Sequence, residues 1–348
     1  MLSRGPQDGG VRGTGVVPAR AARRDAGAEV DRVAAAAERL AALLSAGLAP
    51  GPAWANVDVG VDPDAGRRVG RAARRQAHRE SADAEVARAA ASAAAEGAPV
   101  AAAMERVRAH RPDASPAWST LAAAWAVADA AGAPLAGCLA MLAGALRDEA
   151  QLRRESSAAL AGPAASARLV AALPVIAIAF GMLLGFDTAG VLLGSPMGVA
   201  CLVLGSALLW TGARWSRSLV ARAAVAQPAA GIDLELLAVA LSSGASLARA
   251  QALVADALEA HLPGLATSDA AGPVLRLAEH AGAPVAGLLR AEAARVRGAA
   301  RAEGAMRAAA LGVRLMIPLG CCVMPAFVLL GVAPLLISVV TGTLGGAA

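Results

Sequence analysis

The sequence predicts an all-α integral membrane protein with three transmembrane helices and two cytosolic helical-bundle modules related by an internal repeat. Three observations predict this fold class. Two regions almost free of ionisable side chains are long enough to span a bilayer, the remaining chain carries apolar residues at helical spacing, and one short sequence occurs twice. Nothing in the soluble parts alternates with a period of two, so we expect no sheet.

The repeated sequence is Ala131-Gly-Ala-Pro-Leu-Ala-Gly137, which returns as Ala281-Gly-Ala-Pro-Val-Ala-Gly287. The same offset of 150 residues superposes three further pairs, which are Leu139 on Leu289, Arg147 on Arg297 and Gly162 on Gly312. A less regular pair is formed by residues 40–47 and 237–244. We therefore expect two versions of one plan, each a soluble helical module followed by membrane.

The two apolar regions define the predicted spans. Between Leu169 and Ala213 the only ionisable side chain is Asp187, and from Leu315 to Ala348 there is none. About 20 apolar residues in a helix cross the roughly 30 Å of hydrocarbon, so the first region holds two spans and the second holds one. We place them at residues 169–186, 195–213 and 313–340. Asp187 marks the outer turn, and Ser195-Pro196 predicts an N-cap followed by Pro at the first helical position.

Basic residues predict the orientation, because they flank each span on one side only. They are Arg168, Arg214, Arg217, Arg307 and Arg314, whereas the loop at Asp187 and the tail have no Arg. Cytosolic flanks carry the excess of basic residues, so both soluble modules should face the cytosol. Trp210 and Trp215 fit either an interfacial anchor or packing against a neighbouring helix.

The organisation that follows has six parts. They are a disordered N-terminus at 1–28, a first module at 29–166, two spans with a short outer loop at 167–213, a second module at 214–311, a third span at 312–340 and an outer tail at 341–348. In the first module an amphipathic helix over 30–48 should end at Gly47. Its counterpart stops at Gly244 and restarts after the N-cap Ser246. Residues 58–82, with many Arg and polar residues, predict a loop or a loosely held insertion.

Composition excludes several classes of protein. The chain has no Lys, so it cannot form a P-loop of the standard ATPase type. The spans hold no His and no acid except Asp187, which disfavours intramembrane proteolysis and ion-coupled transport. The net charge of +5 is dispersed, and only 2% of the residues are aromatic, so we expect no nucleic acid partner. The four histidines, His78, His110, His261 and His280, lack metal-ligand spacing. We expect no catalytic residue, no cofactor and no metal, hence no enzyme.

Three sets of residues are candidates for contacts. Gly181, Gly185, Gly194 and Gly198 match the small-xxx-small pattern of close helix contact in lipid, or are lipid-facing or turn glycines. Pro318, Pro325 and Pro334 predict a kinked or partly broken third span packed against protein. Arg290, Arg297 and Arg301 lie near one face of a helix expected from about 284 to 310, either as a face for coupling to a partner or as an ordinary solvated face.

Several of these stretches resemble a known family. Leu40-Ala-Ala-Leu-Leu-Ser-Ala-Gly-Leu48 is similar to the opening helix of the type II secretion system F family. Residues 147–174, with 193–198 and Trp215, are similar to its actinobacterial TadB-like members, and residues 312–334 are similar to the end of their TadC-like partner. The resemblance covers roughly residues 30–340 and implies a fusion of the two.

The resemblance implies a non-enzymatic, multi-pass platform in the cell membrane beneath a Tad or Flp pilus. Its implied partners are a hexameric secretion ATPase, pilin subunits, the lipid bilayer, and either further copies of itself or a second platform protein. Two other classes stay open on the residues alone: a membrane subunit of an ATP-driven transporter, and a membrane-tethered scaffold.

Overall fold

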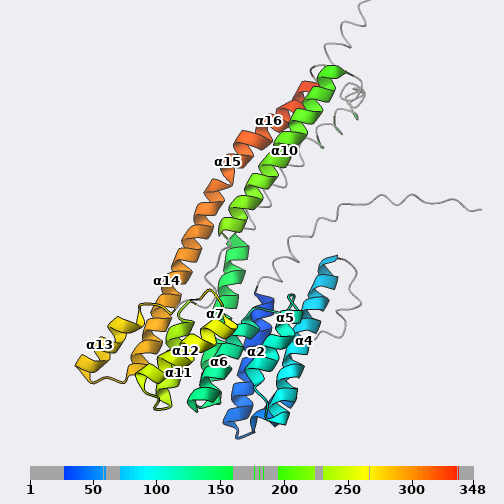
Figure 1. The fold of residues 1–348 in the computed structure, drawn as a ribbon. Coiled ribbons are helices and arrows are strands. Elements are labelled where there is room, and N and C mark those ends of the chain that lie inside the picture. Colours follow the sequence, from blue (N-terminus) through cyan, green and yellow to red (C-terminus); the bar gives the residue numbers. More distant parts are fainter. Residues whose placement is uncertain are drawn as a thin grey trace, which may run out of the picture.

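The computed structural model describes residues 27–57, 59, 71–159, 195–223, 230–265 and 267–334, together with residues 176, 180, 183 and 336. Within these residues all regular secondary structure is helical, as the sequence predicts. The helices form a body, from which two long helices extend side by side as a stalk (Figure 1). The N-terminal 26 residues, most of the predicted span at 169–186, Asp187 and the tail at 341–348 lie outside the described residues.

The first half of the body contains six helices among the described residues. They are α2 (Ala28–Ser45), α3 (Pro50–Ala55), α4 (Arg71–Glu96), α5 (Val100–His110), α6 (Ala117–Ala131) and α7 (Leu135–Ala159). The second half contains α11 (Ile232–Ser242), α12 (Leu247–His261), α13 (Ala271–Ala281) and the first part of α14 (Val285–Arg314). The stalk consists of α10 (Pro196–Ala223) and the rest of α14 with its continuation.

The predicted stop and start signals act where the sequence places them. Gly47 and Gly244 both adopt positive φ, at 91° and 85°, just after the ends of α2 and α11. Glycine reaches this left-handed region without a Cβ clash, so it ends a helix readily. The Ser246 hydroxyl accepts a hydrogen bond from the amide of Arg249 at 3.4 Å, and the Ser195 hydroxyl accepts one from the amide of Gly198 at 2.9 Å. These caps begin α12 and α10.

The prediction of a loop over residues 58–82 is wrong for its second half, because α4 begins at Arg71. Arg, Gln, Glu and Ala are strong helix formers, and a polar composition alone does not distinguish a loop from an exposed helix face. Two acids of α4 are buried rather than exposed. Asp83 accepts hydrogen bonds from Arg32 at 2.8 Å, from the Ser115 amide at 2.8 Å and from Trp118 Nε1 at 3.0 Å.

The two copies of the repeated sequence form the same local structure. Gly132 and Gly282 adopt φ values of 67° and 61° and end α6 and α13. The next amide reaches back to the carbonyl five residues earlier, at 2.8 Å from Ala133 to Ala128 and at 3.2 Å from Ala283 to Ala278. This is the Schellman pattern, after which α7 and α14 begin. Each copy is therefore a tight turn between two helices.

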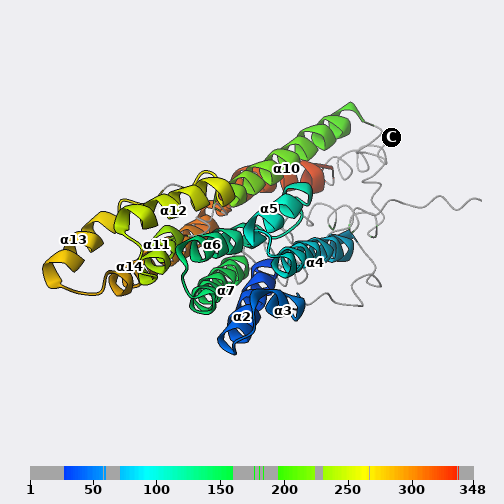
Figure 2. The same ribbon diagram turned by 60° about the horizontal axis from the view of Figure 1, so that its bottom comes forward.

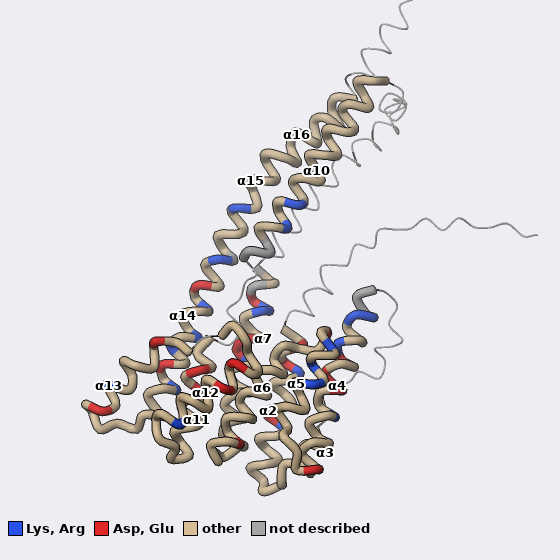
Figure 3. The backbone as a smooth tube through the Cα atoms, viewed as in Figure 1, with Lys and Arg blue, Asp and Glu red and all other residues tan. Residues whose placement is uncertain are grey.

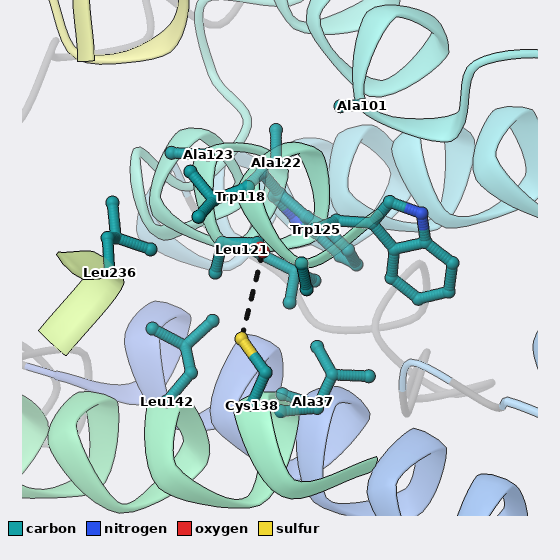
Figure 4. Close-up of a cluster of buried hydrophobic side chains, with 14 of the residues drawn as sticks. Ala37, Ala101, Trp118, Leu121, Ala122, Ala123, Trp125, Cys138, Leu142 and Leu236 are labelled. Atoms are coloured by element: carbon teal, nitrogen blue, oxygen red, sulfur yellow. Dashed lines mark hydrogen bonds between the residues drawn. The ribbon is translucent and has the colours of Figure 1, made fainter. Parts of the chain in front are cut away.

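Both halves of the body share one hydrophobic core. Its centre is α6, which is buried on nearly all sides, including Trp118, Leu121 and Trp125. A helix that is apolar all round belongs in a core. Figure 4 shows Leu236 of α11 directed at Leu121 and Leu142 from the first half. In the turned view α11 and α12 lie against α6 (Figure 2). The two predicted modules are thus packed as one body.

Within the described residues, two helices are long and apolar enough to cross a membrane. They are Pro196–Leu219 and Val285–Val332, and only 17% and 33% of their most apolar windows are buried. The central helix of a soluble protein would be mostly buried, so the exposed apolar surface of the stalk fits a lipid environment. Figure 3 shows the outer part of the stalk without charged residues. The predicted boundaries at 213/214 and 311/312 fall inside continuous helices.

The last part of the stalk is not a regular α-helix, which confirms the interruption that its prolines predict. After α14 come α15 (Met316–Pro318), the π-helix η2 (Leu319–Val323), α16 (Met324–Phe327) and the π-helix η3 (Val328–Val332). Proline lacks the amide hydrogen that an α-helix needs, and insertion of a wider π turn is one accommodation. Pro318, Cys322, Ala326 and Leu330 are buried at intervals of four, longer than the period of 3.6 in an α-helix.

Candidate functional site at the junction of body and stalk

A small cleft lies where α14 leaves the body, with a cavity volume of about 60 Å³. It joins the two halves of the chain, because α7 contributes Leu146 and Asp148, α11 contributes Glu235, and α14 contributes Arg297 and Arg301. We call it the junction cleft. Two of the three predicted arginines of α14 thus meet carboxylates, Arg297 in the second half and Arg301 in the first, at the base of the stalk.

Glu235 and Arg297 form the buried ion pair of the cleft. Glu235 is only 2% exposed, and its Oε1 accepts from the Arg297 guanidinium. Burial raises the pKa of Glu235 above its ordinary value, because a carboxylate is poorly solvated there, and Arg297 opposes this shift. Glu235 Oε2 has no hydrogen-bond partner. Loss of Arg297 would leave a buried, unpaired acid, which is strongly destabilising.

Arg301 connects the two halves directly, through an ion pair between its guanidinium and the Asp148 carboxylate of α7. One turn further along α14, a side chain at Gly304 would meet Leu152 of α7 at 3.8 Å. Beyond this point Met306 is exposed, and α14 has left the body. Arg301 and Gly304 therefore lie beside α7 near the point where α14 enters the stalk.

A corresponding ion pair exists in the first half, between Arg147 of α7 and Glu38 of α2. Arg147 and Arg297 are related by the offset of 150 residues, while Glu38 and Glu235 are related by the offset of 197 that superposes residues 40–47 on 237–244. In each half the arginine after the repeated turn thus pairs with an acid on the helix that opens that half. The first pair is about half exposed, whereas the second is largely buried.

The third predicted arginine, Arg290, lies apart from this cleft. It is exposed, and it lines a second groove with Cys138 and Met141 of α7 and Val239 of α11, with a cavity volume of about 170 Å³. This groove is next to the repeated turns, at the opposite end of the body from the stalk. The structure therefore separates the predicted face into two arginines bound within the chain and one at an open groove.

The described residues include one of the four glycines predicted to make helix contacts. Gly181, Gly185 and Gly194 lie outside the described residues, and Gly198 is buried in the first turn of α10. Close helix contact is made by Gly205 and Gly212. A Cβ at Gly205 would lie 2.5 Å from Leu330 Cγ, and one at Gly212 would lie 2.9 Å from Cys322 Cβ.

The signal for these contacts was a spacing of seven residues, which Gly198, Gly205 and Gly212 share. All three are buried along α10. A repeat of seven returns to the same face of a helix, as in coiled coils. The four-residue pattern indicated Gly198, and its other three glycines lie outside the described residues. The small residues bring α10 close to the irregular part of the stalk.

The described residues offer no candidate for catalysis at this site. They contain no group of three or more His, Cys, Asp or Glu side chains that could hold a metal ion. Cys138 is buried and directs its thiol to the Ala124 carbonyl at 3.7 Å, and burial raises its pKa to about 12 (Figure 4). A thiol with so high a pKa is not a nucleophile near neutral pH. What the arrangement can do is hold α14 to both halves of the body.

Comparison with known proteins gives a match over part of the chain. Residues 64–183 match the family model of the Type II secretion system (T2SS), protein F. The match supports the type II secretion system F family. It includes α4 to α7 and ends in the first predicted span, so it leaves out residues 40–48 and 312–334, for which the sequence also suggested a resemblance.

The protein F domain is found in membrane platform proteins of secretion and pilus systems. Members of this family are non-enzymatic inner-membrane proteins that work with secretion ATPases and pilins. No curated protein and no solved structure matches the chain.

Proposed function

We propose that this chain is a non-enzymatic platform of a Tad or Flp pilus, or of a related type II secretion machine. In this proposal both halves of the body face the cytosol, a separate hexameric ATPase acts on the body, and the stalk contacts pilin subunits in the membrane. The two halves correspond to TadB-like and TadC-like parts joined in one chain. The proposal rests on the family match over residues 64–183 and on the geometry of α14.

The observation that supports it most is the continuity of α14. One helix of 30 residues begins at the second repeated turn, is ion-paired to α11 and α7, and leads into the apolar stalk. At a rise of 1.5 Å per residue it is about 45 Å long. A movement of the body would therefore reach the membrane without passing through a flexible connection.

The charge distribution supports the proposed orientation. Arg214, Arg217 and Arg314 flank residues 196–213 and 315–336, which contain no Asp, Glu, Lys, Arg or His. Figure 3 shows the outer part of the stalk without charged residues. Basic residues accumulate on the cytosolic flanks of spans. The uncharged contact between the two stalk helices also offers no polar path for a transported ion or solute, which disfavours a transporter.

Arg290 is the residue that we assign to the contact with the ATPase. Arg297 and Arg301 are bound to acids of the chain itself, whereas Arg290 is exposed beside an open groove that lies away from the membrane. The groove fits an apolar side chain of the partner, with an acidic neighbour placed against Arg290.

Co-purification of the full chain tests this assignment. The intact protein is required, because the shared core gives no reason to expect either half to fold alone. We expect the cognate hexameric ATPase to be retained by the wild-type chain and by Arg249→Glu, a matched charge reversal at an exposed site on α12. Arg290→Glu should weaken retention at least tenfold, since like charges at an interface cost several kcal/mol. Equal retention by all three chains would remove Arg290 from the interface.

A further inference from the structure

Three exposed arginines surround the stalk where it emerges from the body. They are Arg214 and Arg217 on α10 and Arg314 at the end of α14, which we call the arginine collar. The helices contribute no opposing charge there, because residues 196–223 and 304–336 contain no Asp or Glu. The collar is therefore an uncompensated positive region on two neighbouring helices.

The contacts between the stalk helices place these arginines at a similar level. Gly205 lies against Leu330, and Gly212 lies against Cys322 and the Pro318 carbonyl, so the two helices run antiparallel. Continuing this register for about five residues brings Arg217 of α10 level with Arg314 of α14. Figure 3 shows basic residues on both stalk helices where the uncharged part of the stalk begins.

Aromatic side chains mark the same level as a membrane interface. Trp210 is 67% exposed, and the Arg214 guanidinium carbon lies 5.8 Å from its ring centroid. Trp215 is also exposed. Tryptophan concentrates at the level of lipid headgroups, and an arginine stacked on it keeps its donors directed toward that layer.

We propose that the arginine collar binds the phosphate of an anionic phospholipid headgroup, such as phosphatidylglycerol, in the leaflet next to the body. Arginine suits this ligand because its planar fork of donors matches phosphate oxygens. Basic residues next to a span are attracted to anionic leaflets, with about a fivefold preference for each residue. The inference requires only that the stalk lies in a membrane, so it stands or fails independently of the pilus assignment.

The test measures which lipids the full chain retains. The protein is placed in nanodiscs that contain equal amounts of phosphatidylglycerol and phosphatidylcholine, and lipids bound after gentle release are counted by native mass spectrometry. The wild-type chain should retain phosphatidylglycerol preferentially. Replacement of all three collar residues, R214Q/R217Q/R314Q, should reduce this preference by up to about a hundredfold.

Matched variants distinguish binding at the arginine collar from a general effect of the positive charge of the protein. R88Q/R249Q/R276Q removes three exposed arginines of the body and should keep the wild-type preference. R214K/R217K/R314K keeps the positive charge and should keep most of the preference for phosphatidylglycerol. If the triple variant fails to insert, the single variants R214Q and R217Q serve in its place, because they leave most of the flanking charge. Each should reduce the preference for phosphatidylglycerol about fivefold.

Three results would overturn the proposal. One is equal retention of the two lipids by the wild-type chain, which would show that the collar does not bind anionic lipid and favour a contact with a protein partner. Another is an unchanged preference in the collar variants. The third is saturable binding of inorganic phosphate to the lipid-free chain in neutral detergent with the same dependence on the collar, which would show a site for a free anion instead.

Discussion

At the scale of single residues, the buried ionisable groups hold the halves of the body together. His261 of α12 is partly buried, its buried Nδ1 has no hydrogen-bond partner, and this atom lies 4.0 Å from Glu105 Oε1 of α5. Glu105 also accepts from the Ser119 hydroxyl at 2.6 Å and from Arg108 at 2.8 Å. Burial lowers the pKa of His261, with Arg108 acting in the same direction and Glu105 opposing it.

This lowered pKa predicts a pH dependence of stability. Because the pKa of His261 is lowered in the folded chain, the folded chain binds this proton at a lower pH than the unfolded chain, which takes it up as the pH falls through about 6.5. Acid should therefore reduce the free energy of unfolding. We expect the melting temperature of the full chain in detergent to fall across this range. In His261→Gln the fall should be smaller, while His280→Gln, at an exposed site, should behave as wild type. Equal slopes for all three chains would exclude His261 as the cause.

Most contacts between side chains of different helices could not be predicted from the sequence. The chemistry of Asp83 depends on Arg32, Ser115 and Trp118, which are brought to it from other helices. An acid among polar neighbours gives no local sign of burial. Arg297 and Arg301 of the predicted face line the same cleft, but their acidic partners on α11 and α7 depend on how the helices pack.

At the scale of the elements, local sequence signals predicted where helices begin and end, but they did not predict the polar helix α4. Gly47, Gly244, Ser195 and Ser246 act through their own backbone or side chain, so their effect is visible in the sequence. The start of α4 was missed because its exposed face resembles a loop. The prolines predicted that the last helix is interrupted, but they did not predict where its π-helical segments lie.

The stalk gives a prediction at this scale. Gly205→Ala would place a Cβ 2.5 Å from Leu330 Cγ, so the helices must separate or Leu330 must move. Overpacking of this kind costs about 1–3 kcal/mol. We expect a lower melting temperature of the full chain in detergent, partly restored in the double variant G205A/L330A.

Gly320→Ala serves as the control, because nothing lies within 4 Å of a Cβ at that position. It should melt as the wild-type chain does. A Gly205→Ala chain as stable as Gly320→Ala would show that the seven-residue glycine spacing does not set the distance between the helices.

At the scale of the whole molecule, the sequence predicted an all-helical chain with soluble and membrane parts, but not their arrangement. The two predicted modules share one core around α6, and the repeated turns both lie at one end of the body. Contacts between distant helices cannot be read from periodicity, which reports only which face of each helix is buried. The described part of the chain contains two of the three predicted spans.

The central claim is that α14 couples the body to the membrane as a rigid connection. It is tested by a Gly-Gly insertion after Gly304, which follows the ion pair of Arg301 with α7. Two added residues turn the rest of the helix by about 200° and soften it by about 1 kcal/mol per Gly, without adding charge. The control is the same insertion after Gly264, which lies in the loop before α13.

The decisive measurement is the number of pili on cells that carry only the inserted chain, with membrane insertion and ATPase binding checked in parallel. We expect both chains to insert and to bind the ATPase. Cells with the Gly264 insertion should form pili at normal density, while those with the Gly304 insertion should form none. Normal piliation with the Gly304 insertion would contradict rigid coupling through α14.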